Sequence, residues 1–270
     1  MAGCAAPLAQ PDFEWEAKLR GDAVALLGEV HDNTTLHRQR LAVLQRAVAA
    51  GWRPAIVMEQ FDIDRQADIE RARRERPGDA EHLIAQAGGS GWDWSHYQPL
   101  IELVLAQALP LVAANLPSAA ARRLVREDAP AVLGVARAAA LALDGPGALP
   151  IDAAWRAAQQ GEIARGHCDA LPVALLPGMA RAQFARDAVM ADALRRHAGR
   201  GAVLLAGNGH VRRDIGVPRW LAPIEPASVW TVGFVESGAA AEDGPRAFDA
   251  VVVAAAEPRG DPCAAVRAPR

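Results

Sequence analysis

The chain has 270 residues, with 29 Lys and Arg against 32 Asp and Glu, a formal net charge of -3 and three cysteines. This length suits one large domain or two small ones. The near-neutral charge argues against a nucleic-acid-binding protein, which needs a basic face. Alanine accounts for 61 residues, so the core must come from Leu, Val, Ile and the seven Trp. No run of about 18 apolar residues is present, so we expect no membrane-spanning segment.

The first residues carry a small-small-cysteine pattern, Ala2-Gly3-Cys4, of the kind that ends a bacterial lipoprotein signal. Residues 5–11 have the composition of a flexible tether. The charged and apolar parts of a signal peptide do not precede Ala2 in this sequence. From these residues alone, Cys4 is either the acceptor of a lipid anchor or part of an ordinary cytosolic N-terminus.

Four short apolar runs predict the strands of a sheet, at 23–27, 55–58, 111–114 and 202–206. Helical patterns separate them, with apolar side chains that recur every three or four residues. Continuous apolar strands that alternate with helices predict an α/β fold, in which helices cover both faces of a parallel sheet. Two later runs, 229–235 and 250–253, fit edge strands.

The strand pattern disappears between Pro117 and Pro177, where Ala and Arg dominate. We therefore expect a helical subdomain inserted before the last core strands. A long helix should follow it, over 178–198. The predicted organisation is an N-terminal tether over 1–19, an α/β core over 20–116 and 178–256, a helical insertion over 117–177 and an irregular tail over 257–270.

Each of the four strand candidates ends in residues capable of chemistry: Glu29 with His31, Glu59, Asn115 and His210. In an open parallel sheet the carboxyl ends share one edge, and ligands bind in the crevice beyond it. We therefore expect these side chains to converge. Two carboxylates and two imidazoles suit either a divalent metal or acid-base chemistry in which a carboxylate raises the basicity of a histidine. For any one position alone, a capping or solvated loop residue is the more usual explanation.

Two further groups have alternative explanations. Four residues share one face of the helix predicted from Gly178 onward: Met179, Gln183, Asp187 and Met190. That face either lines the crevice or packs into the core. Three aromatic residues precede another predicted helix: Trp92, Trp94 and Tyr97. These aromatic side chains either pack in the core or bind a planar ligand.

The other two cysteines, Cys168 and Cys263, lie in irregular segments that can meet in the fold. In an exported protein they would form a disulfide that pins the C-terminal tail to the helical part. In a cytosolic protein they would stay reduced. The residues alone leave both alternatives open.

An ordered set of short motifs extends from Leu26 to Pro218: Gly28-Glu29-Val30-His31-Asp32-Asn33, Glu59, Trp94 with Tyr97, Asn115, Gly166-His167-Cys168, Gln183 with Arg186-Asp187 and Met190-Ala191, and Leu205-Ala206-Gly207-Asn208-Gly209-His210-Val211-Arg212 with Asp214 and Gly216-Val217-Pro218. This set resembles the ChaN-like haem-binding lipoproteins. Their wider superfamily includes the Tiki proteases and erythromycin esterases.

The resemblance implies an outer-membrane lipoprotein that faces the periplasm, is anchored through Cys4 and binds haem in bacterial iron uptake. It implies outer-membrane haem uptake machinery as a partner, allows a homodimer and favours the Cys168–Cys263 disulfide. Haem would lie in the crevice at the carboxyl ends of the strands. The expected ligand-binding residues are Glu29, His31, Glu59, Asn115, Met179, Gln183, Asp187, His210 and Arg212. The candidate axial ligands of the haem iron are His167, His210 and Met179.

The alternative function is a hydrolase of the erythromycin-esterase or Tiki type that uses the same crevice. Its catalytic residues, carried over from those relatives, would be Glu29, His31, Glu59 and His210. A divalent metal, if it has one, would be held by His31, His210 and Glu59. In this interpretation His31 activates a water molecule, and His210 and Asn115 stabilise the developing charge. We expect a binding protein first and an enzyme second.

Overall fold

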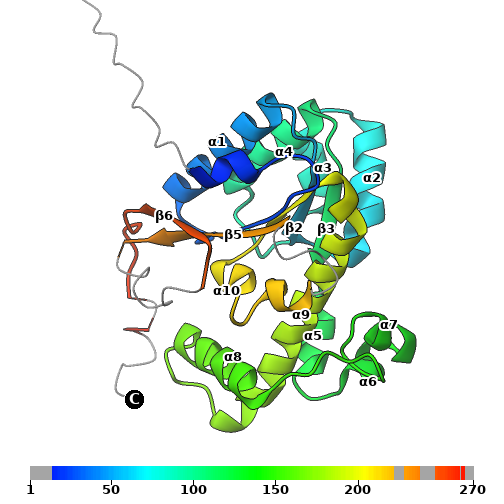
Figure 1. The fold of residues 1–270 in the computed structure, drawn as a ribbon, viewed down its shortest axis with the longest axis vertical. Helices are drawn as coiled ribbons and strands as arrows, with labels where there is room; N and C mark the ends of the chain where they lie inside the picture. Colours follow the sequence, from blue (N-terminus) through cyan, green and yellow to red (C-terminus); the bar gives the residue numbers. More distant parts are fainter. Residues whose placement is uncertain (1–13, 222–227, 238–246, 262, 265–270) are drawn as a thin grey trace, which may run out of the picture.

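A six-stranded parallel sheet runs through the protein (Figure 1). The computed structural model describes residues 14–221, 228–237, 247–261 and 263–264. In order across the sheet, the strands are β3 (Leu111–Asn115), β2 (Ala55–Asp62), β4 (Ala202–Leu205), β1 (Val24–Leu27), β5 (Val229–Glu236) and β6 (Ala250–Ala254). Every neighbouring pair is parallel. The predicted α/β fold is confirmed.

One expectation about the sheet is wrong. The run at 229–235 was expected at an edge, but β5 lies between β1 and β6, and the edges are β3 and β6. All residues of β5 except Trp230 are buried. In β6, by contrast, Val251 and Val253 are exposed and Val252 is buried. The alternating burial of β6 is typical of a strand with one covered face, whereas β5 is covered on both.

Helices cover both faces of the sheet (Figure 1). One face carries α1 (Thr34–Ala49), α2 (Gln66–Glu75), α3 (Ala80–Ala87) and α4 (Gln98–Ala106). The other carries α5 (Ser118–Leu124), α9 (Leu176–His197), α10 (Asn208–Val211) and the 3-10 helix η6 (Val217–Trp220). Successive strand residues point to opposite faces, so Leu27 packs in the core beneath α1 while Leu26 packs in the core against α9.

Three more helices lie beyond α9, on the side away from the sheet (Figure 1): α6 (Ala129–Leu133), α7 (Val135–Ala140) and α8 (Ala153–Gly166). Trp155 of α8 attaches this part to the core. Its ring packs edge-on against Phe184 of α9, at 5.2 Å between centroids, and its Nε1 donates to the Ile215 carbonyl at 2.9 Å. The division of the chain into core, insertion and tail stays a prediction. Among the described residues, no helix combines the length and the apolar character needed to cross a bilayer.

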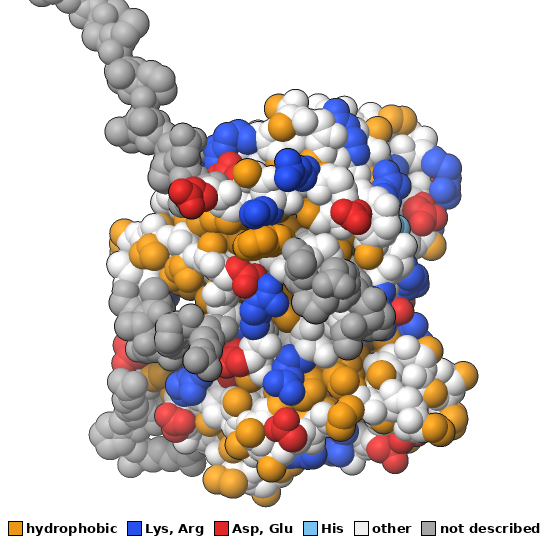
Figure 2. Space-filling view, in the orientation of Figure 1, with side chains coloured by type: hydrophobic (Ala, Val, Ile, Leu, Met, Phe, Trp, Pro, Cys, Tyr) orange, Lys and Arg blue, Asp and Glu red, His pale blue; other side chains and the backbone are white. Residues whose placement is uncertain are grey.

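The described chain begins with a 3-10 helix, η1 (Glu14–Lys18), which falls within the range predicted as a tether. Its Trp15 is buried and packs edge-on against Phe234 of β5, with 6.5 Å between the ring centroids. Residues 14–18 are thus attached to the core in this structure. On the surface, the face seen in Figure 2 intersperses acidic and basic side chains, in keeping with the small net charge.

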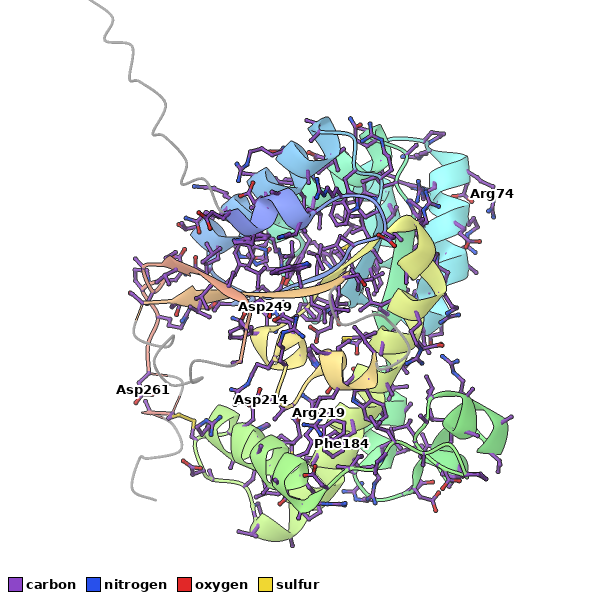
Figure 3. All side chains as sticks on the ribbon, in the orientation of Figure 1. Arg74, Phe184, Asp214, Arg219, Asp249 and Asp261 are labelled. Atoms are coloured by element: carbon purple, nitrogen blue, oxygen red, sulfur yellow. A yellow bond between two sulfur atoms is a disulfide. The ribbon has the colours of Figure 1, made fainter. Side chains whose placement is uncertain are left out.

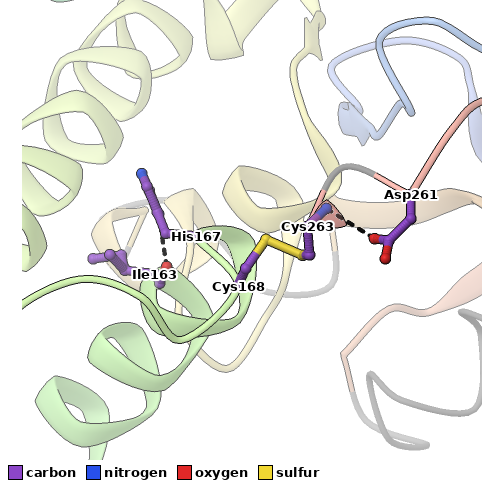
Figure 4. The surroundings of a disulfide bond; sticks show 5 residues. All are labelled: Ile163, His167, Cys168, Asp261 and Cys263. Atoms are coloured by element: carbon purple, nitrogen blue, oxygen red, sulfur yellow. Dashed lines mark hydrogen bonds between the residues drawn. A yellow bond between two sulfur atoms is a disulfide. The ribbon is translucent and has the colours of Figure 1, made fainter. Parts of the chain in front are cut away.

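A disulfide joins Cys168, just after α8, to Cys263 in the C-terminal segment (Figure 4). Their Cα atoms are 5.6 Å apart, and 95 positions separate them in sequence. In the chain-entropy model, closing a loop of this size stabilises the fold by about 4 kcal/mol, because it restricts the unfolded chain. The bond ties the C-terminal segment to the helical part. Cys4 lies outside the described residues.

Candidate functional site

The site is built around Glu29, which follows β1 and is 3% exposed. Its Oε1 accepts three hydrogen bonds, from His31 Nδ1 at 2.6 Å, Tyr97 OH at 2.6 Å and Gln60 Nε2 at 3.0 Å. Its Oε2 forms an ion pair with the buried guanidinium of Arg40. Since an ionised carboxylate only accepts hydrogen bonds, Glu29 fixes the proton of His31 on Nδ1.

Charge and burial compete at this centre. Burial disfavours the ionised form of Glu29, but the Arg40 guanidinium and the hydrogen bond from His31 outweigh it, and they hold the pKa of Glu29 well below its usual range. Burial and the charge of Glu29 raise the pKa of Tyr97, so its hydroxyl keeps the proton it donates. Burial lowers the basicity of His31, yet the Glu29 carboxylate prevails and raises its pKa.

Two residues of α1, His37 and Arg40, form hydrogen bonds with the loop from Gly28 to His31, which carries Glu29. Arg40 donates to the Gly28 carbonyl at 3.2 Å and to His37 Nδ1 at 3.1 Å. Burial and the charge of Arg40 lower the pKa of His37 to about 4, so its ring is neutral and accepts from Arg40. Its other nitrogen, Nε2, donates to the His31 carbonyl at 3.0 Å. Residues three apart on one helix face therefore hold the loop from Gly28 to His31 at both ends.

A second polar centre surrounds His210, on α10. Its Nδ1 donates to Asp187 of α9 at 2.6 Å, and its Nε2 lies 3.5 Å from Glu59 Oε1. Glu59 Oε2 in turn accepts from the Gly207 amide at 2.8 Å. Burial opposes the charged form of His210, but the carboxylates of Glu59 and Asp187 outweigh it and raise its pKa. The two carboxylates therefore favour the protonated form of His210, while burial raises the pKa of its partner Asp187 to about 6.

Gly207 brings the two centres together. A Cβ at this position would lie 3.1 Å from His31 Cε1 and 3.8 Å from Glu59 Oε2. Its φ of -54° is ordinary, so close approach of the two side chains, rather than backbone conformation, is what glycine permits here. Of the five strand-end residues predicted to converge, Glu29, His31, Glu59 and His210 thus lie close together, whereas Asn115 bonds to Arg186.

A cavity of about 710 Å³ opens beyond the carboxyl ends of β2 and β3. Its lining residues are Glu59, Gln60, Asp62, Arg65, Ala87, Gly88, Gly89, Ser90, Gly91, Trp92, Asn115, Ser118, Arg122 and Arg186. The indole of Trp92 also meets the His31 ring edge-on, at 4.9 Å between centroids. This contact places His31 beside the cavity wall.

A smaller hollow of about 290 Å³ adjoins this cavity, with which it shares Ser118, Arg122 and Arg186. Its other lining residues are Ala121, Val125, Ile163, His167, Met179, Ala182 and Gln183. Arg186 donates to Asn115 Oδ1 at 2.7 Å. In the described part of the chain, no carboxylate lies within ion-pair distance of Arg122 or Arg186. The two hollows therefore meet at two arginines that form no ion pair with a described carboxylate, although Arg186 interacts electrostatically with Asp62, which lines the larger cavity.

Most of the remaining predicted site residues lie at the His210 centre or line one of the two cavities. Asp187 joins the His210 centre, Asn115 lines the larger cavity, and Met179 and Gln183 line the smaller one. Arg212 is directed elsewhere, because it pairs with Asp214 at 2.8 Å and Glu162 at 3.2 Å. Figure 3 shows Asp214 between α10 and α8. Arg212 thus connects the core to α8 and does not line either cavity.

The geometry gives no support to the expected divalent metal. Within the described ranges, no group of three or more His, Cys, Asp or Glu side chains is arranged to hold a metal ion. Among the predicted metal ligands, His31 and His210 each direct Nδ1 to a carboxylate, and the Nε2 of His210 faces Glu59.

Four contributors to the site were not identified from the sequence: Arg40, His37, Gln60 and the hydroxyl of Tyr97. A signal was present for two of them. His37 and Arg40 fall on the same face of α1 as the buried Leu36 and Leu44, and an arginine on an apolar helix face needs a buried partner. The hydrogen bonds of Gln60 and Tyr97 depend on tertiary packing, which leaves no local pattern.

Comparison with known proteins adds a family and a fold. The model of a family described as haem-binding uptake, Tiki superfamily, ChaN matches residues 15–221. ChaN of Campylobacter jejuni, solved in a study of cofacial haem binding, is 20% identical, with 80% of this chain and 82% of that chain covered and a TM-score of 0.65. A mutant of the erythromycin esterase EreC in its open conformation is 14% identical, with coverages of 82% and 72% and a TM-score of 0.45. No curated protein sequence matches the chain.

The substitution Arg40→Leu tests the support of Glu29. It leaves a buried carboxylate without its cation, so we expect the free energy of unfolding at pH 7 to fall by about 3–5 kcal/mol. The loss should shrink as the pH falls below the ordinary pKa of Glu, about 4.3, because the paired Glu29 contributes its stability only where the unfolded chain is ionised. Urea denaturation at several pH values measures both effects.

The matched control is Arg38→Leu, on the same helix. Arg38 is exposed and forms no ion pair with a described residue, so its replacement should change stability by no more than about 0.5 kcal/mol. Equal losses in the two variants, or a loss in Arg40→Leu that is the same at every pH, would contradict the role given to Arg40.

Proposed function

We propose that this chain, which belongs to the haem-binding uptake family of the Tiki superfamily (ChaN), binds haem in the cavity beyond the carboxyl ends of β2 and β3. Membership of the family carries the proposal. The cavity supports the location, since its volume of about 710 Å³ lies within the usual range of small-molecule and cofactor sites, about 300–1,000 Å³. It also stands at the sheet edge where α/β proteins bind ligands.

The lining residues fit the chemistry of haem, a flat apolar ring with two anionic propionates. Trp92 offers an aromatic surface at the wall. Arg122 and Arg186 have no described carboxylate to pair with, and guanidinium groups bind carboxylates through paired, charge-assisted hydrogen bonds.

We further propose that the protein acts in bacterial haem and iron uptake as an outer-membrane lipoprotein that faces the periplasm. Cys4 would carry the lipid, and the outer-membrane uptake machinery and a second copy of the chain would be its partners. The family description names uptake, and the Cys168–Cys263 disulfide suits an oxidising compartment.

Mass spectrometry of the full gene product isolated from bacterial membranes under alkylating conditions tests this setting. We expect a lipid on Cys4 and an intact disulfide. An unmodified Cys4 in a soluble protein with reduced Cys168 and Cys263 would contradict the proposal. Sedimentation of the purified protein, with and without haem, measures whether the chain forms a homodimer.

Haemin titration tests binding directly. The purified protein should give a shifted Soret band at micromolar concentration, and Arg122→Gln and Arg186→Gln should each weaken haem binding by about 10–100-fold, the loss of a hydrogen bond to a charged group. Haem dimethyl ester, which lacks the propionate charges, should bind all three proteins alike. Arg126→Gln, an exposed arginine outside both cavities, is the control and should bind as the wild type does. A wild type without a shifted Soret band overturns the proposal.

The second candidate is a hydrolase, which the placement of His210 between Asp187 and Glu59 favours. Such an array can take up and release a proton next to His31. A panel of ester substrates, combined with metal analysis, compares the wild type with His210→Asn. Turnover that the substitution abolishes would support an enzyme. Haem binding without turnover on any ester would remove this candidate.

A further inference from the structure

The chain leaves β6 through residues 255–261, which we call the C-terminal strap. These residues form neither helix nor strand, and they lie outside residues 15–221, the range that the family model matches. One end of the strap continues from β6, and the other reaches Cys263, which the disulfide joins to Cys168 after α8 (Figure 4). Figure 3 shows Asp261 at this second end, beside α8. The strap is thus fixed covalently at both ends.

The strap is bonded to the turn that directly follows His31. Within this turn, Asn33 also caps α1, since its Oδ1 accepts from the Leu36 amide at 3.0 Å. The strap therefore holds both the turn and the start of the helix. Its contacts are Arg259 with Asp32 at 2.7 and 2.9 Å, the Ala255 carbonyl with Asn33 Nδ2 at 3.0 Å, and Glu257 Oε1 with the Thr34 amide at 3.1 Å.

Glu236, at the end of β5, is the second attachment point of the strap. It is 8% exposed, so its carboxylate needs donors in place of water. Arg259 donates to both of its oxygens at 2.7 Å, and the Glu257 amide donates to Oε1 at 3.1 Å. Asn33 Nδ2 donates to the same oxygen at 2.7 Å. Glu236 thus joins the strap and the turn in one hydrogen-bond network.

The network alone is a weak fastening, because its outer part is open to solvent. The side chains of Asp32 and Arg259 are 60% and 34% exposed, and exposed ion pairs contribute little to stability. The end of a chain is usually poorly ordered unless it is tied down. Cys263 comes four residues after Arg259, a span of at most about 14 Å. The disulfide therefore keeps Arg259 within reach of its two carboxylates.

The backbone on the other side of the disulfide is strained. Cys168 and Asp169 have φ angles of 59° and 54°, in the left-handed region that favours glycine. Cys168 directly follows the C-cap of α8, a position where glycine is usual. Such conformations persist only where the surrounding structure enforces them. Both cysteines are partly exposed, so a small thiol can reach the bond, and the turn can relax once the bond is broken.

We propose that the Cys168–Cys263 disulfide is a redox-sensitive clasp, whose reduction by a dithiol releases the C-terminal strap from the turn after His31. A thiolate of the dithiol attacks one sulfur, forms a mixed disulfide and displaces the other cysteine, which takes up a proton. The second thiol of the reductant then displaces the first cysteine. The protein gains two electrons and two protons as two thiols, and the reductant becomes a disulfide.

Release of the strap removes its bonds to the turn, and His31 is then held only from within the core, by Glu29 and His37. The mobility of the loop that carries His31 thus follows the redox state of the protein. This proposal goes beyond haem binding and does not depend on it.

Trypsin tests the release, because it cleaves after Arg259 only when that side chain is free of Asp32 and Glu236. The full chain is compared as isolated and after treatment with dithiothreitol, alkylation and desalting, and all digests are reduced before mass spectrometry. We expect cleavage after Arg259 to be at least about tenfold faster in the reduced protein, since proteolysis follows the population of the open form. Cleavage after Arg200, which precedes β4, should change by less than about twofold. Cys263→Ser should behave as the reduced protein, with or without dithiothreitol.

Hydrogen exchange reports on the turn itself. Reduction should speed exchange of the Thr34 and Leu36 amides by about tenfold or more, while the amides of β1 and β4 keep their protection. Arg259→Gln should speed exchange at the same two amides in the oxidised protein. Arg46→Gln is the matched control, because Arg46 lies near the other end of α1 and forms a similarly exposed, two-bond pair with Glu16. It should leave the two amides unchanged.

Equal cleavage and equal exchange in the oxidised and reduced proteins would overturn the proposal. Loss of protection in β1 and β4 on reduction would also overturn it, because the bond would then support the whole fold instead of the strap. The reduced wild type decides the question if Cys263→Ser does not fold. A wild type that binds no haem refutes the proposed function and leaves the clasp unaffected.

Discussion

The rest of the site depends on one buried ion pair, between Glu29 and Arg40. A carboxylate that is 3% exposed stays ionised only with a nearby cation and hydrogen bonds to its remaining lone pairs. Arg40 supplies the cation from α1, while Gln60 and Tyr97 donate from β2 and from the residue before α4. Since these donors come from separate elements, the pair can form only when the elements are in their native positions, so the fold and the geometry of the site are specified together.

The fold was predictable because a parallel sheet covered on both faces requires strands that are apolar throughout, and such runs are visible in the sequence. The same feature explains the misplaced strand. An uninterrupted apolar run shows that a strand is covered, but the notion of an edge at 229–235 came only from its late position in the chain. β5 lies between β1 and β6. Its two polar residues, Thr231 and Glu236, are buried, but their residue types do not indicate a central strand. The alternating exposure of β6 is visible only once its neighbouring strands are known.

Sequence position identified the strand-end residues because the carboxyl ends of parallel strands are fixed by topology alone. Sequence position did not predict the direction of a side chain that follows the short helix α10. Arg212 comes two residues after His210, yet the end of α10 turns it toward Asp214 and Glu162. Arg40 is buried, although its residue type suggests exposure. Its charge indicates a solvated helix face, and only the apolar residues around it on α1 indicate the buried position that the structure shows.

The two histidines of the crevice show how similar surroundings produce different chemical capacities. Each has Nδ1 on a buried carboxylate and a raised pKa. His210 has a second carboxylate beside Nε2 and is 9% exposed, so both of its ring nitrogens face carboxylates and the residue connects β2, α9 and α10. His31 has only one carboxylate, behind the ring, and half of its side chain is open. A proton on Nε2 of His31 can therefore leave for water, and the ring packs so closely against Gly207 that a Cβ there would lie 3.2 Å from Nε2. The difference in partners, rather than in residue type, separates a histidine that supports the framework from one that is free to bind a ligand.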